Sequence, residues 1–234
     1  MSAPRSARDR VRQELTREIL DVARAHLARD GAGALSLRSV ARQLEMAPSA
    51  LYRYFSSRDD LLSALILDAY ESLADCAEEA ADAAAEHHDD LAGRWSAVPR
   101  SMRAWALDHP HEWGLVFGSP VPGYQAPQAT VVPYARLAAA VVSPVVAAQR
   151  HGRLRQPPVP ERPDTLAASI RPVAEELLPG LPTATVARAL QTWATLIGII
   201  SLEVFGHWRN TVLEPSALFD QTVADLGRDL GLDR

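Results

Sequence analysis

The chain has 234 residues, a formal net charge of −5 and a hydrophobic content of 47%. This length allows a small head of about 60 residues and a second domain that buries its own core. Cys76 is the only cysteine, which excludes an intrachain disulfide. The chain shows no signal-peptide pattern, and its longest apolar run, at residues 193–202, is too short to cross a bilayer. We therefore expect a cytoplasmic protein with no membrane partner.

Charge is distributed unevenly along the chain. Residues 1–60 carry 11 arginines against 8 acidic residues, whereas residues 61–234 carry 13 arginines against 21 acidic residues. A basic N-terminal segment on an acidic remainder places a nucleic-acid interface at the N-terminus. Residues 1–12 precede the first expected helix, Leu15 to Asp30, and form either an arm that follows a minor groove or a solubilising tail. The basic residues of this arm are Arg5, Arg8, Arg10 and Arg12.

Residues 36–55 have the pattern of two short helices joined by a tight corner. Ser36 is a suitable N-cap for the first helix. Pro48 suits the first turn of the second helix, which we expect to run to about Tyr54. Apolar residues at helical spacing give the first helix a buried face: Leu37, Val40, Ala41 and Leu44. The pattern predicts a helix-turn-helix whose second helix enters the major groove of DNA.

This module resembles the N-terminal domain of the TetR/AcrR family of bacterial transcription regulators. The matching parts are the helix 15–30 with Gly31 after it, Val40-Ala41, and the segments 35–38, 51–55 and 57–62. One departure is Glu45, because the family usually carries a glycine at this corner. The resemblance implies an all-α protein of two domains. Residues 1–60 would form the DNA-binding domain, and residues 61–234 a helical domain for effector binding and dimerisation.

The resemblance also implies which side chains contact DNA. Hydroxyl and guanidinium groups donate hydrogen bonds to phosphates, which agrees with the residue types at these positions. The alternative is that Tyr52 and Tyr54 are buried in a small core, where each hydroxyl would need a partner. The expected DNA-binding residues are Ser36 and Arg38 of the first helix, Ser49, Ala50, Tyr52 and Tyr54 of the recognition helix, and Arg58 after it.

Two further helices are expected, from Ser57 toward Ala85 and from Leu91 to Asp108. The first would join the two domains. The polar residues 87–90, with the sequence His-His-Asp-Asp, lie between the two helices. We expect no metal site there, because neighbouring positions on a helix point in different directions.

Residues 109–124 combine aromatic and polar residues with turn-forming glycines and prolines. The segment resembles the ligand domain of the TetR branch named for a Trp-His-Gly signature, although these letters are not contiguous here. Nearby aromatic residues either line an effector pocket or fill the core. The candidate pocket residues are Trp105, His109, Trp113, Phe117, Trp193 and Ile197. The resemblance does not identify the effector, and the aromatic lining favours an apolar or aromatic molecule.

A helix is expected over residues 131–151, with a kink at Pro144. Residues 153–165 contain four prolines and no apolar periodicity. This composition indicates a loop or linker inside the second domain.

The last two predicted helices, residues 183–208 and 215–230, are the expected homodimer interface. The first is apolar on more than one face, so it must be covered on more than one side. Its main stripe consists of Val186, Leu190, Trp193, Ile197, Ile200, Val204 and Trp208. Small residues such as Gly198 and Ser201 allow another helix to approach closely. Glu203 is either a polar group of a pocket or a residue at the rim of the interface.

A two-fold dimer of such domains presents two recognition helices to an inverted-repeat operator. The resemblance implies a repressor that a small-molecule effector releases from this double-stranded DNA. The alternative is a constitutive or architectural DNA-binding protein without an effector, which the acidic second domain disfavours. No combination of nucleophile, base and orienting group is visible, so we expect neither catalysis nor a cofactor.

Overall fold

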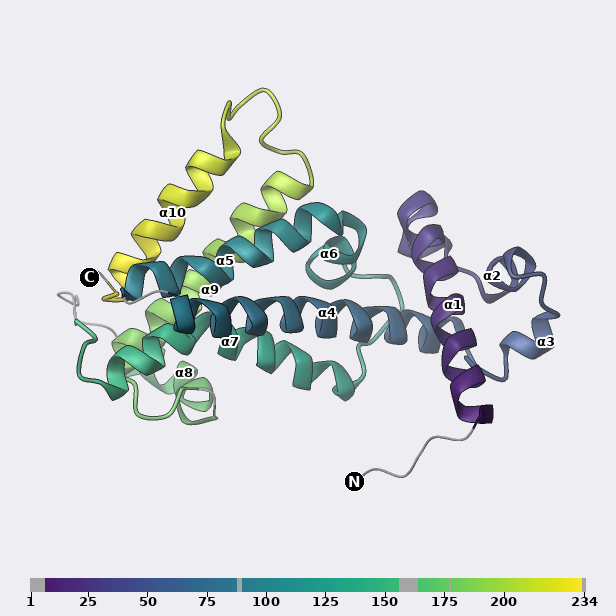
Figure 1. The fold of residues 1–234 in the computed structure, drawn as a ribbon, viewed down its shortest axis with the longest axis horizontal. Coiled ribbons are helices and arrows are strands. Elements are labelled where there is room, and N and C mark those ends of the chain that lie inside the picture. The colour runs from purple at the N-terminus through teal and green to yellow at the C-terminus, as the bar shows by residue number, and fades with distance from the viewer. Residues whose placement is uncertain (1–6, 88–89, 156–163, 177, 233–234) are drawn as a thin grey trace. The chain divides into compact units, whose positions relative to one another are not determined.

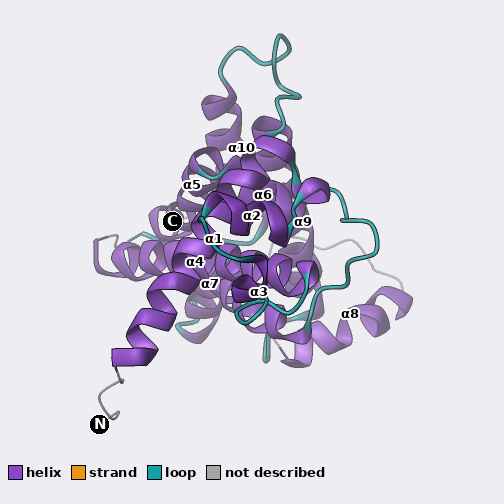
Figure 2. Ribbon diagram, turned by 90° about the vertical axis from the view of Figure 1, so that its right-hand side faces the viewer, coloured by secondary structure: helices purple, strands orange, loops and turns teal. Residues whose placement is uncertain are grey.

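The computed structural model describes residues 7–87, 90–155, 164–176 and 178–232, and these residues form helices and loops without a strand (Figures 1 and 2). The predicted all-α class is confirmed. Two compact units make up the chain. The first contains residues up to Ala69 together with His111–Thr130, and the second contains Tyr70–Pro110 and the chain from Val131 onward. The sequence offered no sign that residues 111–130 pack with the N-terminal unit.

The first unit is built around helix α1 (Ala7–Asp30), the first helix in the purple part of Figure 1. Its buried residues recur at helical spacing, as a one-sided core helix requires: Ile19, Leu20, Ala23, His26 and Leu27. A short 3-10 turn, η1 (Ala32–Ala34), leads to α2 (Leu37–Gln43) and α3 (Pro48–Leu51). Both short helices bury apolar anchors, including Val40 and Leu51.

Two predicted boundaries in this unit were wrong. Helix α1 begins at Ala7, so Arg8, Arg10 and Arg12 lie on a helix rather than in an extended arm. Their side chains are exposed, and arginine has a high helix propensity, which permits the longer helix. Arg5 lies outside the described residues. Helix α3 ends at Leu51, and Tyr52 to Tyr54 continue as turns, because Arg53 and Tyr54 donate to carbonyl oxygens only three residues earlier.

Helix α4 (Arg58–His87) contributes its first part to the first unit and its remainder to the second. The other helices of the second unit are α5 (Leu91–Asp108), α7 (Val131–Arg150), α8 (Asp164–Glu176), α9 (Thr183–Val204) and α10 (Pro215–Asp229). Helix α6 (Pro110–Phe117) and the 3-10 turn η2 (Gln128–Thr130) lie in the segment between α5 and α7. Most of the predicted loop 153–165 falls at residues 156–163, outside the described residues.

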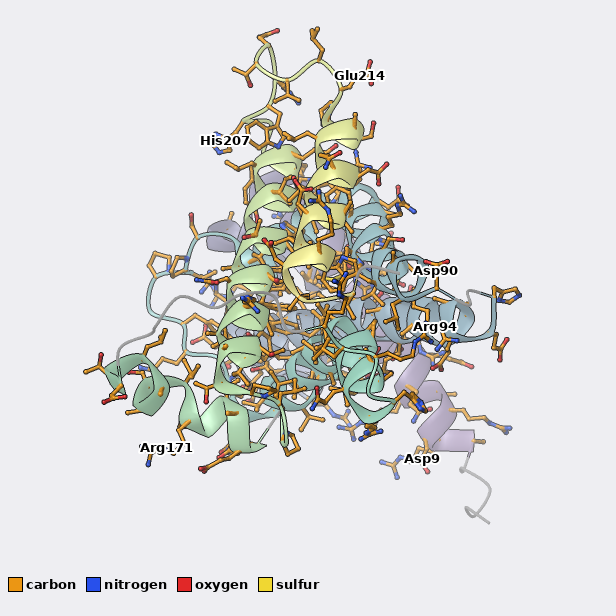
Figure 3. All side chains as sticks on the ribbon, turned by 90° about the vertical axis from the view of Figure 1, so that its left-hand side faces the viewer. Asp9, Asp90, Arg94, Arg171, His207 and Glu214 are labelled. Carbon is orange, nitrogen blue, oxygen red and sulfur yellow. The ribbon has the colours of Figure 1, made fainter. Side chains whose placement is uncertain are left out.

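Helix α10 packs on α5 and α9 within the second unit. The buried Trp95 indole of α5 donates a hydrogen bond of 2.7 Å to the carbonyl oxygen of Val223 on α10. Gly227 permits this contact, because a Cβ atom there would lie 2.6 Å from the Trp95 ring. Figure 3 shows His207 and Glu214 on the loop that connects the end of α9 to the start of α10.

The buried face of α9 differs from the predicted stripe. Val186 and Ile200 are buried as expected, but Leu190 is 37% exposed. The face turned inward also uses small side chains, which fit between closely packed helices. It contains Thr185, Ala189, Thr192, Leu196 and Ile200. Larger apolar side chains therefore lie on the outer side of α9, including Phe205 just after its end, which is 45% exposed.

Two segments, Gln128–Arg150 and Thr183–Val204, are long and apolar enough to span a membrane by length and composition alone. This finding corrects the expectation that no apolar run in the chain reaches that length. Each segment also contributes buried residues to the second unit, among them Leu137 and Leu196. Core helices of soluble proteins meet the same criteria of length and composition.

Candidate nucleic-acid interface and apolar cavity

The corner between α2 and α3 follows a known helix-ending geometry. The amide of Met46 donates to the carbonyl oxygen of Ala41, as in a Schellman motif. Glu45 occupies the position after the helix cap with a φ of 54°, in the left-handed region. Glycine adopts this region without steric cost, whereas other residues do so at a cost. The corner therefore closes in the geometry of a helix-turn-helix, although a glutamate stands where glycine would fit better.

Helix α3 and the turn after it carry exposed polar side chains. Ser49 is exposed and Tyr52 is 45% exposed, while Leu51 between them is fully buried. The buried leucine fixes the helix to the unit and turns its neighbours toward solvent. Among the other predicted DNA contacts, Arg38 is exposed, and Ser36, Ala50 and Tyr54 are half-buried. An exposed Tyr52 removes the alternative in which this ring fills a small core.

A basic hollow of about 390 Å³ lies beside Tyr54. Its lining includes Arg8, Arg12 and Arg53, and the Arg12 guanidinium lies 5.7 Å from the centre of the Tyr54 ring. Guanidinium groups are frequent phosphate ligands in proteins. Sequence reasoning missed Arg53 as a candidate contact, although its place beside Tyr52 and Tyr54 was a usable signal.

Arg58 is engaged within the first unit. Its Nε donates to the carbonyl oxygen of Leu35 at 3.1 Å, and its Nη2 donates to those of Ala32 and Gly33 at 2.8 and 3.4 Å. These bonds attach the start of α4 to the connection between α1 and α2. The structure thus gives Arg58 a positioning contact that the sequence did not indicate.

Arg24 joins three helices of the first unit. It pairs with Asp21 on its own helix and with Asp68 on α4, and its Nε lies 3.3 Å from Glu112 Oε1 on α6. Residues 24, 68 and 112 are far apart in sequence, which is why no sequence pattern revealed the cluster. Helix α6 is therefore linked by charge to the helix that supports the DNA-binding corner.

The six candidate effector-pocket residues do not come from one unit. Trp113 is fully buried and contacts Phe117 in the first unit, with ring centres 4.5 Å apart. Trp105 and His109 stack at 4.8 Å in the second unit, where the Trp105 indole donates to Ser72 Oγ. Trp193 and Ile197, also of the second unit, lie on α9.

An apolar cavity of about 170 Å³ lies in the second unit, between α7, α8 and α9. Trp193 lines it, whereas the other five candidate pocket residues do not. The described lining residues include no charged side chain. They include Tyr134, Ala138 and Val142 of α7, Val173 of α8, and Leu190 and Trp193 of α9.

Three aromatic rings from three helices meet beside this cavity. The Tyr134 ring packs edge-on against Trp193 at 5.6 Å and against Tyr70 of α4 at 6.0 Å. Burial raises the pKa of both tyrosines above the ordinary value. Tyr134 also forms a hydrogen bond with Trp193, which partly opposes the shift of its pKa.

Glu203 has a defined partner in the same unit. Arg103 of α5 donates through Nε to Glu203 Oε2 at 2.7 Å and through Nη2 to Oε1 at 2.5 Å. These hydrogen bonds raise the pKa of Arg103, and its guanidinium also lies 5.3 Å from the Phe219 ring centre. The glutamate therefore fixes α9 to α5 and does not line the apolar cavity.

No group of three or more histidine, cysteine or acidic side chains among the described residues could hold a metal ion. His87 contacts the carbonyl oxygen of Ala83 through Nδ1 at 2.7 Å. His88 and Asp89 of the same cluster lie outside the described residues.

A small unit with a helix-turn-helix, an exposed serine on its second helix, an exposed tyrosine directly after it and arginines around them defines a DNA-binding protein. A helix-turn-helix unit followed by a larger helical unit is the arrangement of a transcription regulator.

Comparisons with known proteins agree. The model of bacterial regulatory proteins of the tetR family matches residues 19–65, and that of the tetracyclin repressor-like C-terminal domain matches residues 95–226. The HTH-type transcriptional regulator Rv1816 of Mycobacterium tuberculosis is 37% identical over 217 residues, which covers 89% of both chains. The regulator Mb1846 of Mycobacterium bovis matches to the same extent. The chain belongs to the TetR family of transcription regulators.

Solved structures show the same fold. The crystal structure of the protein SCO4313 has a TM-score of 0.76 and 35% identity, and the match covers 96% of this chain and 98% of that chain. The TetR family regulator PfmR of Thermus thermophilus shares the fold with a TM-score of 0.57 at 15% identity, over 92% of this chain and 99% of that chain. The chain is thus an all-α, DNA-binding transcription regulator of a family that dimerises, and not an enzyme.

Proposed function

We propose that this regulator is a cytoplasmic repressor that binds an inverted-repeat operator as a homodimer and leaves it when a small-molecule effector binds. The observation that carries the DNA part is the exposed Tyr52 beside the buried anchor Leu51. An aromatic side chain held at the surface by a buried neighbour is positioned to contact DNA rather than to fill a core.

The proposed DNA contacts fall into two groups. Ser49, Ala50 and Tyr52 would face the base edges and the adjoining backbone in the major groove. Ser36, Arg38 and Tyr54, together with the arginines of the basic hollow, would hold phosphates. Arg58 would act through the connection 32–35, where its hydrogen bonds lie.

The proposed dimer interface lies on the outer faces of α9 and α10. Leu202 and Phe205 are exposed at or just after the C-terminal end of α9, and Leu218 is exposed on α10. Apart from the neighbouring backbone of α9 itself, no atom of the described residues lies within 4 Å of the position that an added Cβ atom at Gly198 would take. Exposed apolar side chains beside a glycine favour close packing of a second helix pair, which supports a four-helix interface related by a two-fold axis.

The effector part rests on the second unit and on helix α4. A ligand that binds one conformation of this unit more tightly lowers operator affinity by that difference, typically about 1–3 kcal/mol. Helix α4 belongs to both units, so a change in its position in the second would reach the first. The Arg24 cluster connects α4 and α6 to α1 and supports the same route.

Fluorescence anisotropy with DNA duplexes from the regions flanking the protein's own gene tests the DNA part. Wild type is expected to bind one inverted repeat tightly at near-physiological salt and to bind random duplexes weakly. Tyr52→Ala is expected to lose at least tenfold in operator affinity. Gln125→Ala, a change at an exposed position of the same unit outside the basic hollow, serves as the control and is expected to bind as wild type.

The alternative is a constitutive architectural protein. Such a protein would bind all duplexes alike, with a steep dependence on salt. Equal affinity for operator and random DNA, unchanged in Tyr52→Ala, would favour this alternative over the repressor.

A further inference from the structure

The apolar cavity between α7, α8 and α9 limits what can occupy it by its size. Its volume is about 170 Å³. Pockets for drug-sized ligands have volumes of about 300–1,000 Å³, whereas an engineered apolar cavity of about 150 Å³ binds benzene. This volume matches a molecule with one six-membered ring.

The lining limits the chemistry of the ligand. Small alanines on α7 and branched side chains on α8 and α9 form the walls, and no described lining residue carries a charge. A charged ligand buried there would lose its hydration without gaining a counter-ion. The ligand is therefore uncharged and mainly apolar.

One corner of the cavity is polar and aromatic. Tyr134 and Trp193 both line it, and they lie edge to face with ring centres 5.6 Å apart. A ligand ring can extend this arrangement of aromatic edges and faces. The Tyr134 hydroxyl can exchange a hydrogen bond with one small polar substituent on that ring.

We propose that this cavity binds one small, uncharged, monocyclic aromatic molecule with a short polar substituent such as a phenolic hydroxyl. The role of this molecule as the effector rests on the proposed function, whereas its binding to the cavity does not.

The test uses phenol with the full-length protein and isothermal titration calorimetry. Ala138→Leu places a larger side chain in the cavity wall and is expected to weaken phenol binding at least tenfold. Ala104→Leu makes the same change at an exposed position of α5, away from the cavity, and is expected to bind phenol as wild type does. Benzoate, which has the same ring and a negative charge, is expected not to bind.

A second variant covers the outcome in which Ala138→Leu does not fold. Tyr134→Phe keeps the ring and removes the hydroxyl, so phenol binding is expected to weaken several-fold while toluene binding is retained. Undetectable binding of phenol and toluene to wild type would overturn the proposal. Equal phenol affinity in wild type, Ala138→Leu and Tyr134→Phe would also overturn it, because the site would then lie elsewhere.

Operator anisotropy with and without phenol separates this inference from the proposed function. If phenol binds the cavity but leaves operator affinity unchanged, the ligand site stands and phenol is not the effector. If another compound releases the operator equally from wild type and Ala138→Leu, while phenol fails to bind, the repressor function stands and the cavity inference is overturned.

Discussion

Arg103 and Glu203 form a bidentate ion pair that joins α5 to α9, and their side chains are only 21% and 13% exposed. Removing one member of a buried pair leaves the other charge without its partner. We expect Arg103→Ala or Glu203→Ala to lower the free energy of unfolding by about 2–3 kcal/mol, less than for a fully buried pair because some solvent reaches this one. Urea denaturation at fixed protein concentration measures this change.

The double variant Arg103→Met/Glu203→Leu is the control for this pair. Apolar side chains of similar length remove both charges, so most of the lost stability is expected to return. Single variants that lose less than about 0.5 kcal/mol would contradict a structural role for the pair, because surface changes have effects of that size.

The left-handed backbone at Glu45 predicts a stabilising substitution. Glu45→Gly removes the steric cost of a Cβ atom at a φ of 54° and is expected to raise stability by about 1 kcal/mol. The greater freedom of glycine in the unfolded chain offsets part of this gain. Thermal unfolding followed by circular dichroism measures the change, and a lower melting temperature in Glu45→Gly would show that the side chain makes a compensating contact.

Alanine substitutions at two glycines in helices of the second unit are expected to have different effects, one on folding and the other on dimerisation. An added Cβ atom at Gly227 would lie 2.6 Å from the Trp95 ring, whereas one at Gly198 would contact no described side chain and no described backbone outside α9. Gly227→Ala is expected to destabilise the fold by about 1–3 kcal/mol through overpacking. Gly198→Ala is expected to preserve the fold of the single chain. It is expected to weaken the dimer about tenfold, because the added methyl group would crowd the partner's helix at a cost within the same range of about 1–3 kcal/mol.

Sedimentation equilibrium over a range of concentrations measures the dimer dissociation constant of both variants. A Gly198→Ala protein that dimerises as tightly as wild type, and gains the roughly 1 kcal/mol of helix propensity of alanine over glycine, would place the dimer interface elsewhere.

Two partly buried tyrosines predict how stability responds to alkaline pH. Burial raises the pKa of Tyr70 and Tyr134, so the folded protein favours their neutral form relative to an unfolded tyrosine with a pKa of about 10. The stability that these residues contribute is therefore fully present below pH ~10 and is lost as pH rises above it. In an alkaline titration followed by phenolate absorbance, some tyrosines of the native protein should ionise at a higher pH than the tyrosines of the protein unfolded in urea. The double variant Tyr70→Phe/Tyr134→Phe should lack this late ionisation, and its persistence there would assign it to other tyrosines.

The helical pattern of the chain could be predicted because each long helix buries one face at regular spacing. The expected helix from Leu91 to Asp108 has the same bounds in the structure, and the expected helix over residues 131–151 is α7. The inner face of α9 could not be predicted, because the threonines and alanines that pack there are no more hydrophobic than its outer residues. Hydrophobicity alone does not distinguish a face that packs within one chain from a face that remains exposed for a partner.

The candidate sites were predictable to different degrees. The positions of Ser49 and Tyr52 follow from local sequence, since the corner and the buried Leu51 fix them. Arg58 and Glu203 each have partners more than 20 residues away in the chain, so their contacts required the tertiary structure. Locating the cavity also required the tertiary structure, because its walls come from three helices. Of its lining residues, only Trp193 belonged to the predicted pocket.

Selection of binding sites from a pool of random DNA duplexes tests most directly that this chain reads an inverted repeat as a dimer. Wild type is expected to enrich one sequence with two-fold symmetry, with half-sites centred about one helical turn (roughly 34–36 Å) or a multiple of it apart. Tyr52→Ala is expected to enrich that sequence weakly or not at all. Enrichment of an asymmetric single site, or of no sequence from a protein shown to be folded, would contradict binding of an inverted-repeat operator by a two-fold dimer.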